Sequence, residues 1–210
     1  YAPLVAGLIA RSMHTLALIT GETKGATTWS QRRGCVTAAS VAGPVDSAPL
    51  GALEGTSAVP WRGPMPAALG GLPPFSAEEP LLTLRSDACL VDTRATGGTR
   101  GLREAVVDLR VDGEQDVTFA MTTDGPAVLE VGGQRVIVRT ADAGDGTVLR
   151  FARAHVTGNV ARAVIRLADG GQGATFELDA WGQDGFALPS RAPSPGETAD
   201  ATVKPLEPID

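Results

Sequence analysis

The sequence has few of the residues on which most enzyme sites depend. Its 210 residues include two histidines, His14 and His155, and two cysteines. Neither a His-Glu-x-x-His nor a Cys-x-x-Cys pattern occurs, which argues against a metal site with His and Cys ligands. A Gly-x-Ser-x-Gly elbow is absent, and "GETKG" at 21–25 lacks the Gly-Lys-Ser/Thr ending of a phosphate loop. We therefore expect no enzymatic activity, no metal and no cofactor.

The small number of cysteines limits the redox chemistry of the chain. Cys35 and Cys89 are the only two, in a chain long enough to fold without disulfide staples. This pattern favours reduced, buried thiols in an intracellular protein. A disulfide is the alternative, and it would favour a secreted module.

Long unbroken apolar runs are also absent. The N-terminal segment "YAPLVAGLIARSMHTLALIT" is interrupted by Arg11 and His14, and a membrane span needs roughly 18 apolar residues in succession. We therefore expect no membrane association. Aromatic residues make up 4% of the chain and the formal net charge is −6, which excludes a surface that is basic all over but allows a local basic strip.

Two segments of the sequence show helical spacing of apolar residues. In the N-terminal segment, apolar residues fall on one helical face, and they are Val5, Leu8, Ile9, Met13 and Leu16. Residues 100–110 show the same spacing, and "TVLRFARAH" at 147–155 is a further candidate helix. A strand pair of moderate quality is expected within 27–43.

β-Structure is predicted to dominate after residue 116. The segment 116–142 has the pattern of three short strands joined at Asp124-Gly125 and Gly132-Gly133, dipeptides that favour tight hairpins. Another hairpin is expected around 169–171. Pro and Gly are frequent in 44–80, which indicates a connector, and the Pro-rich, acidic stretch from 189 indicates a flexible tail.

The arginines of the expected helices are spaced for contact with phosphate groups. At 100° per residue, Arg100, Arg103 and Arg110 gather on one flank of their helix, and Arg150 and Arg153 repeat the three-residue spacing. Each row alone is typical of a solvated helix face. Two helices with the same arrangement, without interleaved aromatic residues, favour contacts with DNA that carry no sequence information.

The order of these segments resembles a repeat of the sliding DNA clamp family (PCNA-like). The resemblance rests on a helix followed by "DVTFAMTTDGPAVLEV", a further helix and the closing strands "FELDAWGQDGFALPS". The closing strands and the Pro/Ser-rich tail together look most like the tailed subunit of the heterotrimeric checkpoint clamp. The resemblance implies an α+β clamp fold with antiparallel sheets outside and helices lining a concave inner face. It divides the chain into a partial N-terminal repeat (1–43), the connector (44–80), a C-terminal repeat (81–188) and the tail (189–210).

The resemblance also implies a function without bond chemistry. The chain would be one subunit of a nuclear ring that encircles double-stranded DNA as a scaffold for damage checkpoint signalling and repair. Its partners would be two other clamp subunits, a clamp loader and checkpoint signalling proteins. Ser194, before Pro195 in the tail, is a candidate phosphorylation site, and an inert terminus is the alternative. The expected DNA-facing side chains are Arg11, Arg100, Arg103, Arg110, Arg150 and Arg153.

Two other classes of protein remain open. One is an extracytoplasmic β-rich binding or assembly module, of pilus or capsid type, in which helices are packing elements and the arginines serve solubility. The other is an enzyme that uses clustered carboxylates, although the scattered Asp and Glu residues select no particular pair.

Overall fold

The fold is mainly antiparallel β, with two helices at the start of the chain. The computed structural model describes residues 2–45, 82–86, 88–97, 101–139, 147–169, 174–193 and 198–207. Helices α1 (Ala2–Thr20) and α2 (Thr23–Arg33) come first, and one short 3-10 helix, η2 (Thr93–Thr96), follows later. Across the described ranges, ten strands form one sheet. They are β1 (Ala38–Val45), β2 (Leu82–Arg85), β3 (Val91–Asp92), β4 (Gly101–Thr123), β5 (Ala127–Val131), β6 (Gln134–Arg139), β7 (Val148–Asp169), β8 (Thr175–Trp181), β9 (Ser190–Arg191) and β10 (Thr202–Pro205).

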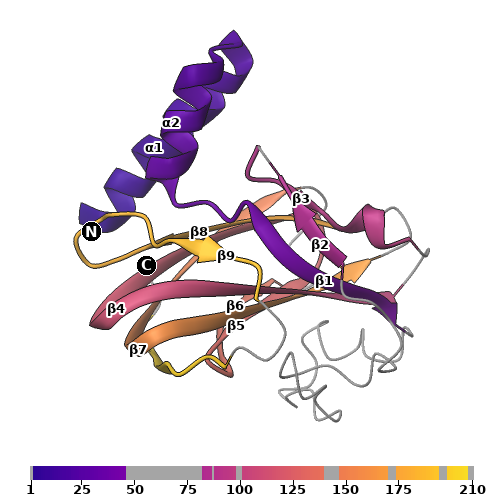
Figure 1. Cartoon of the computed structure of the whole chain (residues 1–210), viewed down its shortest axis with the longest axis vertical. Coiled ribbons are helices and arrows are strands. Elements are labelled where there is room, and N and C mark those ends of the chain that lie inside the picture. Colours follow the sequence, from indigo (N-terminus) through magenta and orange to yellow (C-terminus); the bar gives the residue numbers. More distant parts are fainter. Residues whose placement is uncertain are drawn as a thin grey trace.

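Two long strands, β4 and β7, organise the sheet and run side by side (Figure 1). They pair antiparallel from Gly101 opposite Asp169 to Thr123 opposite Val148. The first half of β4 also pairs with β1, and its second half pairs with β8. The second half of β7 also pairs with β5, and its first half pairs with β10. Each long strand therefore belongs to two groups of neighbours.

A β-bulge marks the point where these two groups meet. The register between β4 and β7 shifts between Arg110 and Gly113, and Gly113 lies opposite Gly158. Bulges bend and twist a sheet locally. Gly158 has a φ of +134°, and a Cβ there would lie 2.7 Å from the Cα of Ala201, so no other residue fits. Beyond the bulge the sheet curls until β10 lies against β6.

One hydrophobic core fills the inside of the curled sheet. Alternate residues of β4 point into it on both sides of the bulge, as the two-residue period of a strand requires. Partners come from the same face of β7, β5 and β8. The largest of these buried core side chains are Phe119, Phe176, Leu109, Met121, Leu129, Ile165, Leu167 and Leu178.

The clamp fold expected from the resemblance is wrong. Both α-helices of the described residues lie within the first 33 residues and project away from the sheet, so no helices line a concave inner face (Figure 1). Residues 100–110 were expected to be helical, but the described part, 101–110, belongs to β4. The candidate helix at 147–155 is likewise part of β7 from Val148 onward. The arginines in these segments therefore do not lie along helical flanks.

The physical reason is that the apolar pattern of this segment fits both periods. Leu102, Ala105, Val106 and Leu109 follow helical spacing, while positions 105, 107, 109 and 111 alternate as in a strand. Three β-branched valines, Val106, Val107 and Val111, favour the strand, and pairing with β7 and β1 satisfies its backbone.

The expected turns are partly found. Gly132 and Gly133 connect β5 to β6 in a hairpin, as predicted. Asp124 and Gly125 lie between β4 and β5, but these strands do not pair with each other, since β5 pairs with β6 and β7. The expected hairpin around 169–171 is also wrong, because β8 pairs with β4 and β3.

The remaining segments differ from the sequence interpretation in part. The strand pair expected within 27–43 is half correct, because α2 continues to Arg33 and β1 begins at Ala38. Most of the connector expected at 44–80 lies outside the described residues. Within the segment assigned to a flexible tail, residues 190–191 and 202–205 form β9 and β10.

Candidate functional site

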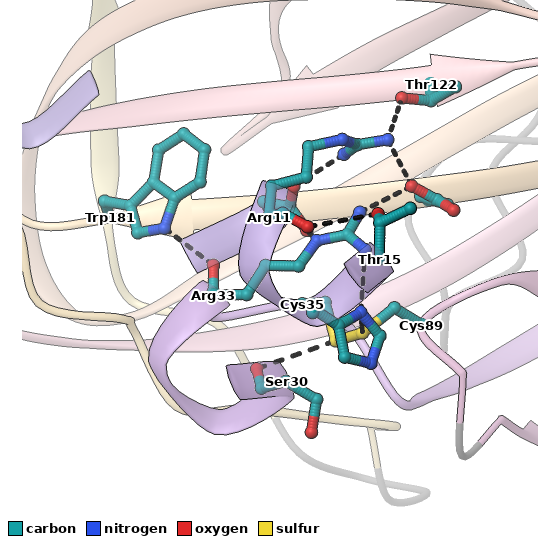
Figure 2. Close-up of polar contacts among 11 residues, drawn as sticks. Arg11, Thr15, Ser30, Arg33, Cys35, Cys89, Thr122 and Trp181 are labelled. Carbon is teal, nitrogen blue, oxygen red and sulfur yellow. Dashed lines mark hydrogen bonds and ion pairs between the residues drawn. A yellow bond between two sulfur atoms is a disulfide. The ribbon is translucent and has the colours of Figure 1, made fainter. Parts of the chain in front are cut away.

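The two helices form a hairpin that stands on one side of the sheet. The chain turns at Gly21, where φ is +72°, and α1 and α2 lie side by side (Figure 1). Near its N-terminus α1 packs against Trp181, the last residue of β8. A Cβ at Gly7 would lie 2.3 Å from the Trp181 ring, so glycine is needed for this approach. The buried Trp181 indole also donates a hydrogen bond from Nε1 to the carbonyl oxygen of Arg33 (2.6 Å, Figure 2).

A network of ion pairs fastens the hairpin to the sheet, and we call it the hairpin clasp. It consists of Arg11, Arg33, Thr122, Glu177 and Asp179 (Figure 2). Arg11 Nη1 lies 2.7 Å from Asp179 Oδ2, and Arg33 Nε lies 2.7 Å from Asp179 Oδ1. Arg33 Nη2 lies 2.5 Å from Glu177 Oε2, an oxygen that Arg11 also contacts. Arg11 Nη2 donates to Thr122 Oγ1 at 2.7 Å, so the clasp ties α1 to both β4 and β8 and ties α2 to β8.

Burial makes this clasp sensitive to the loss of any charge. The Asp179 side chain has no exposed surface and that of Arg33 is 2% exposed. Burial raises the pKa of Asp179, and the guanidinium groups of Arg33 and Arg11 oppose that rise. A single buried charge left without its partners would be strongly destabilising.

A buried histidine and a disulfide lie next to the clasp. The Nδ1 atom of His14 is 3.3 Å from Arg33 Nη1 and 3.9 Å from the Sγ atom of Cys89. Burial lowers the pKa of His14, and the nearby Arg33 lowers it further. The Nε2 atom of His14 has no hydrogen-bond partner. These features favour a neutral imidazole that fills space between helix and sheet.

The expectation of two reduced thiols is wrong. Cys35 and Cys89 form a disulfide, with their Cα atoms 5.5 Å apart (Figure 2). Cys35 follows the end of α2 by two residues, and Cys89 precedes β3 by two. The disulfide therefore links the base of the helical hairpin to the edge of the sheet, beside the clasp.

The opposite side of α1 is apolar and exposed, and we call it the apolar stripe. At 100° per residue its members fall on one face of the helix, and they are Val5, Ile9, Met13, Leu16 and Ile19. These side chains are between 36% and 78% exposed. The residues that face the protein are small or polar, namely Gly7, Ala10, His14 and Ala17. The apolar face that would normally be buried in a globular protein thus faces outward.

The N-terminal helix is also more apolar than its lack of an unbroken apolar run indicated. By length and composition alone, α1 qualifies as a helix that could cross a membrane. Arg11 is its one formally charged side chain, and a single interruption leaves the average apolar enough. The prediction that the chain does not associate with membranes therefore loses its argument.

A hollow adjoins the apolar stripe. Its volume is about 790 Å³, and it lies between α1, α2 and the segment 185–187. Ile9, Trp29 and Phe186 give it apolar walls, while Thr28 and Arg32 place polar groups on one side. Phe186 is 74% exposed, and its neighbour Gly185 lies close to Pro3 and Ala6 of α1. The exposed aromatic ring therefore extends the apolar stripe at its N-terminal end.

Two of the arginines predicted to face DNA, Arg11 and Arg103, lie mostly buried in contacts within the protein. Arg11 belongs to the clasp. Arg103 is 1% exposed and donates to the carbonyl oxygens of Thr93 (3.0 Å) and Gly97 (2.8 Å), so that it holds η2 against the sheet.

The other predicted DNA-facing arginines that the structure describes lie on strands. Arg110 is largely exposed and lies 3.3 Å from Asp112, and Arg153 lies 2.9 Å from Asp116. Arg150 is exposed on β7. Arg100 and Ser194 lie outside the described residues. DNA contact by these residues stays a prediction, but they are not gathered on helical flanks.

A second charged cluster crosses the outer face of the sheet. Glu104 of β4 lies opposite Arg166 of β7, which also lies 2.5 Å from Glu130 of β5. Four residues further along β4, Asp108 forms a bidentate ion pair with Arg162, with distances of 2.8 and 3.0 Å. Burial raises the pKa of Glu104 to about 8 despite Arg166, and its Oε1 atom has no hydrogen-bond partner. Glu104 is therefore mainly protonated at neutral pH.

We predict that Glu104→Gln removes a pH dependence of stability. The pKa of Glu104 is about 8 in the folded chain and near 4.5 when unfolded, so the folded state holds the proton between these values. Stability therefore falls as pH rises from 4.5 to 8, by up to about 1.4 kcal/mol per pH unit. Urea titrations from pH 5 to 8 should show the Gln variant gaining on the wild type as pH increases. Glu207→Gln, at an exposed position, is the control. A difference that does not change with pH would contradict this assignment.

In the residue ranges that the structure describes, no group of three or more His, Cys, Asp or Glu side chains could hold a metal ion. The sequence analysis missed four residues of the clasp, Arg33, Thr122, Glu177 and Asp179, and also Phe186 beside the hollow. No sequence pattern marks Phe186 as an exposed aromatic residue. A signal for Glu177 and Asp179 was present, because the alternation in "TFELDAW" places both on one face of a strand.

Comparisons with known proteins find no relative in sequence. No family model and no curated protein matches the chain. Among solved structures, it is similar to the PA14 sugar-binding domain from an RTX adhesin, with 19% identity and a TM-score of 0.36 over 44% of this chain and 52% of that one. It is also similar to a β-glucosidase from Kluyveromyces marxianus, with 15% identity and a TM-score of 0.38 over 49% of this chain and 14% of that one. The chain thus spans about half of the adhesin domain and a small part of the enzyme. Likenesses this low carry no argument about its function.

Proposed function

We propose that this chain is an extracytoplasmic β-sheet module for binding or assembly, and that it carries out no bond chemistry. The observation that carries the proposal is the Cys35–Cys89 disulfide. Disulfides form and persist in oxidising compartments and are rare in the cytosol and nucleus. Cys89 is fully buried and Cys35 nearly so, which is typical of a structural and not a catalytic disulfide.

The position of the disulfide supports a structural role. It lies at the base of the helical hairpin, where it acts together with the clasp to hold the hairpin in one orientation. A module that presents a surface to a partner gains affinity when that surface is preorganised. The disulfide and the clasp hold the hairpin, and so they fix the orientation of its apolar stripe and of the hollow.

The sheet itself offers positions for assembly. Among the described strands, β2 pairs with β1 alone, and its four side chains are mostly exposed. An edge strand of this kind can accept a strand from another chain through backbone hydrogen bonds.

The clamp hypothesis has lost its structural basis, because the helices that would line the ring are strands. Duplex DNA binding, checkpoint partners and a nuclear location stay predictions of the resemblance. They would be tested by DNA retention of the purified chain at increasing salt.

The oxidation state of the cysteines tests the proposed function. We expect that the chain, produced with an export signal, has no thiol that reacts in denaturant, and two that react after reduction. The same chain produced in a reducing cytosol should be less stable and more easily proteolysed. If the reduced and oxidised chains were equally stable, the proposal would be overturned. The fold would then not depend on the disulfide, or on the oxidising compartment in which disulfides form.

A further inference from the structure

The apolar stripe and the hollow remain without a role in the clasp or the core. We propose that they dock on the surface of an anionic lipid bilayer, with α1 lying in the plane of the interface. The proposal adds a ligand to the module described above, but it does not depend on the oxidation state of its cysteines.

Apolar surface is gathered on one side of the hairpin. The five side chains of the apolar stripe follow α1 along its length, and Phe186 continues the row at the N-terminal end. Interfacial helices bury such a face to about 5–10 Å in the boundary between headgroups and acyl chains. The hollow next to Ile9, Trp29 and Phe186 gives the end of an acyl chain room between the helices.

Basic side chains flank this apolar surface. Lys24, Thr28 and Arg32 are spaced four residues apart on α2 and share one face, and Thr28 and Arg32 line the hollow. The Arg32 guanidinium lies 5.1 Å from the centre of the Trp29 ring. Lysine, arginine and tryptophan beside an apolar face are typical of contact with anionic headgroups.

The overall charge sets the orientation. The chain carries a net charge of −6, so an anionic surface repels most of the protein. Within the hairpin, Arg11 and Arg33 are neutralised by Glu177 and Asp179. Lys24 and Arg32 remain, and Glu22 is the one acidic residue of 2–33. The hairpin is therefore locally basic in a chain that is acidic overall, and an anionic bilayer attracts it.

The contacts of the clasp favour an α1 that lies in the interface over an α1 that crosses the bilayer. A crossing α1 would have to withdraw Arg11 from Asp179 and expose the buried face at Gly7 and His14. An arginine at the centre of a bilayer is costly, and breaking a buried ion pair adds a further cost. Lying in the interface leaves all these contacts in place.

A second copy of the chain is the competing occupant. A stable protein interface buries about 800 Å² on each partner. The apolar stripe has only five side chains, each of them partly buried, and the basic residues on both copies would repel each other. Lipid, which has no such area requirement, fits better.

Vesicle binding tests the proposal. The full chain should sediment with vesicles of phosphatidylcholine and phosphatidylserine, more weakly with phosphatidylcholine alone, and less at high salt. Ile9→Ser/Leu16→Ser and Phe186→Ser should each reduce binding at least about tenfold, because burial of one such side chain is worth about 1.5–3 kcal/mol. Lys24→Glu/Arg32→Glu should abolish the preference for phosphatidylserine.

Matched controls lie elsewhere on the surface. Val138→Ser changes an exposed apolar residue of β6, and Lys204→Glu reverses a charge on β10, so both should bind vesicles as the wild type does. Thermal unfolding confirms that each variant is folded. Equal binding by stripe variants and controls, or no sedimentation of the wild type, would overturn the proposal. So would a lipid-free dimer that Ile9→Ser/Leu16→Ser converts to a monomer, since the stripe would then be occupied by a second copy.

Discussion

Replacing Asp179 with alanine is expected to lower the free energy of unfolding by about 3–5 kcal/mol. The side chain is fully buried and accepts bonds from Arg11 and Arg33, each at 2.7 Å. Without it, the buried Arg33 guanidinium keeps Glu177 as its remaining carboxylate partner in the clasp. Urea unfolding followed by circular dichroism would measure the loss.

Two further variants separate burial from simple charge removal. Arg33→Met/Asp179→Leu should recover much of the loss, because a well-packed apolar pair can replace a buried ion pair. Arg94→Ala removes the exposed Arg94–Asp92 pair and should leave the unfolding midpoint within experimental error. If Asp179→Ala were no more destabilising than Arg94→Ala, the clasp would not hold the hairpin.

Removing the disulfide should have an effect of similar size. The bonded cysteines are 54 residues apart, and a cross-link that closes such a loop stabilises a protein by about 4 kcal/mol in the chain-entropy model. Cys35→Ser/Cys89→Ser should therefore unfold at much lower denaturant concentration than the oxidised wild type.

The single variants provide the control for this measurement. Either Cys35→Ser or Cys89→Ser removes the whole cross-link, so each should lose about as much stability as the double variant. Reduced wild type should unfold with them. Losses that add up across the two single variants would show that packing of the side chains, and not the cross-link, is responsible.

Local sequence patterns predicted the elements that local interactions determine. The helix at the N-terminus and the hairpin at Gly132-Gly133 are both found, because helical periodicity and positive φ are properties of short segments. Residues 101–110 were misassigned because their apolar residues fit two periods. Pairing with β7, some 60 residues away in sequence, decides between them, and a short window of sequence does not contain that information.

The candidate site was less predictable than the elements that form it. Arg11 was singled out as a DNA contact, but its partner Asp179 is 168 residues away and no sequence pattern connects them. The apolar spacing of α1 was read correctly as one face. Which way that face points depends on Gly7 and Ala10, whose small size lets the other side of the helix approach the sheet.

The continuous pairing of β4 with β7 has a consequence for how the molecule opens. Both strands pass through the bulge at Gly113 and contribute to the neighbours on each side of it. If β1 separates from the first half of β4, the second half of the same strand is still paired with β8. Amide groups on the two sides of the bulge should therefore exchange with solvent in a single cooperative opening, not as two independent units. The helical hairpin, joined to this block through side chains, is the part that can open separately once its clasp and disulfide are broken.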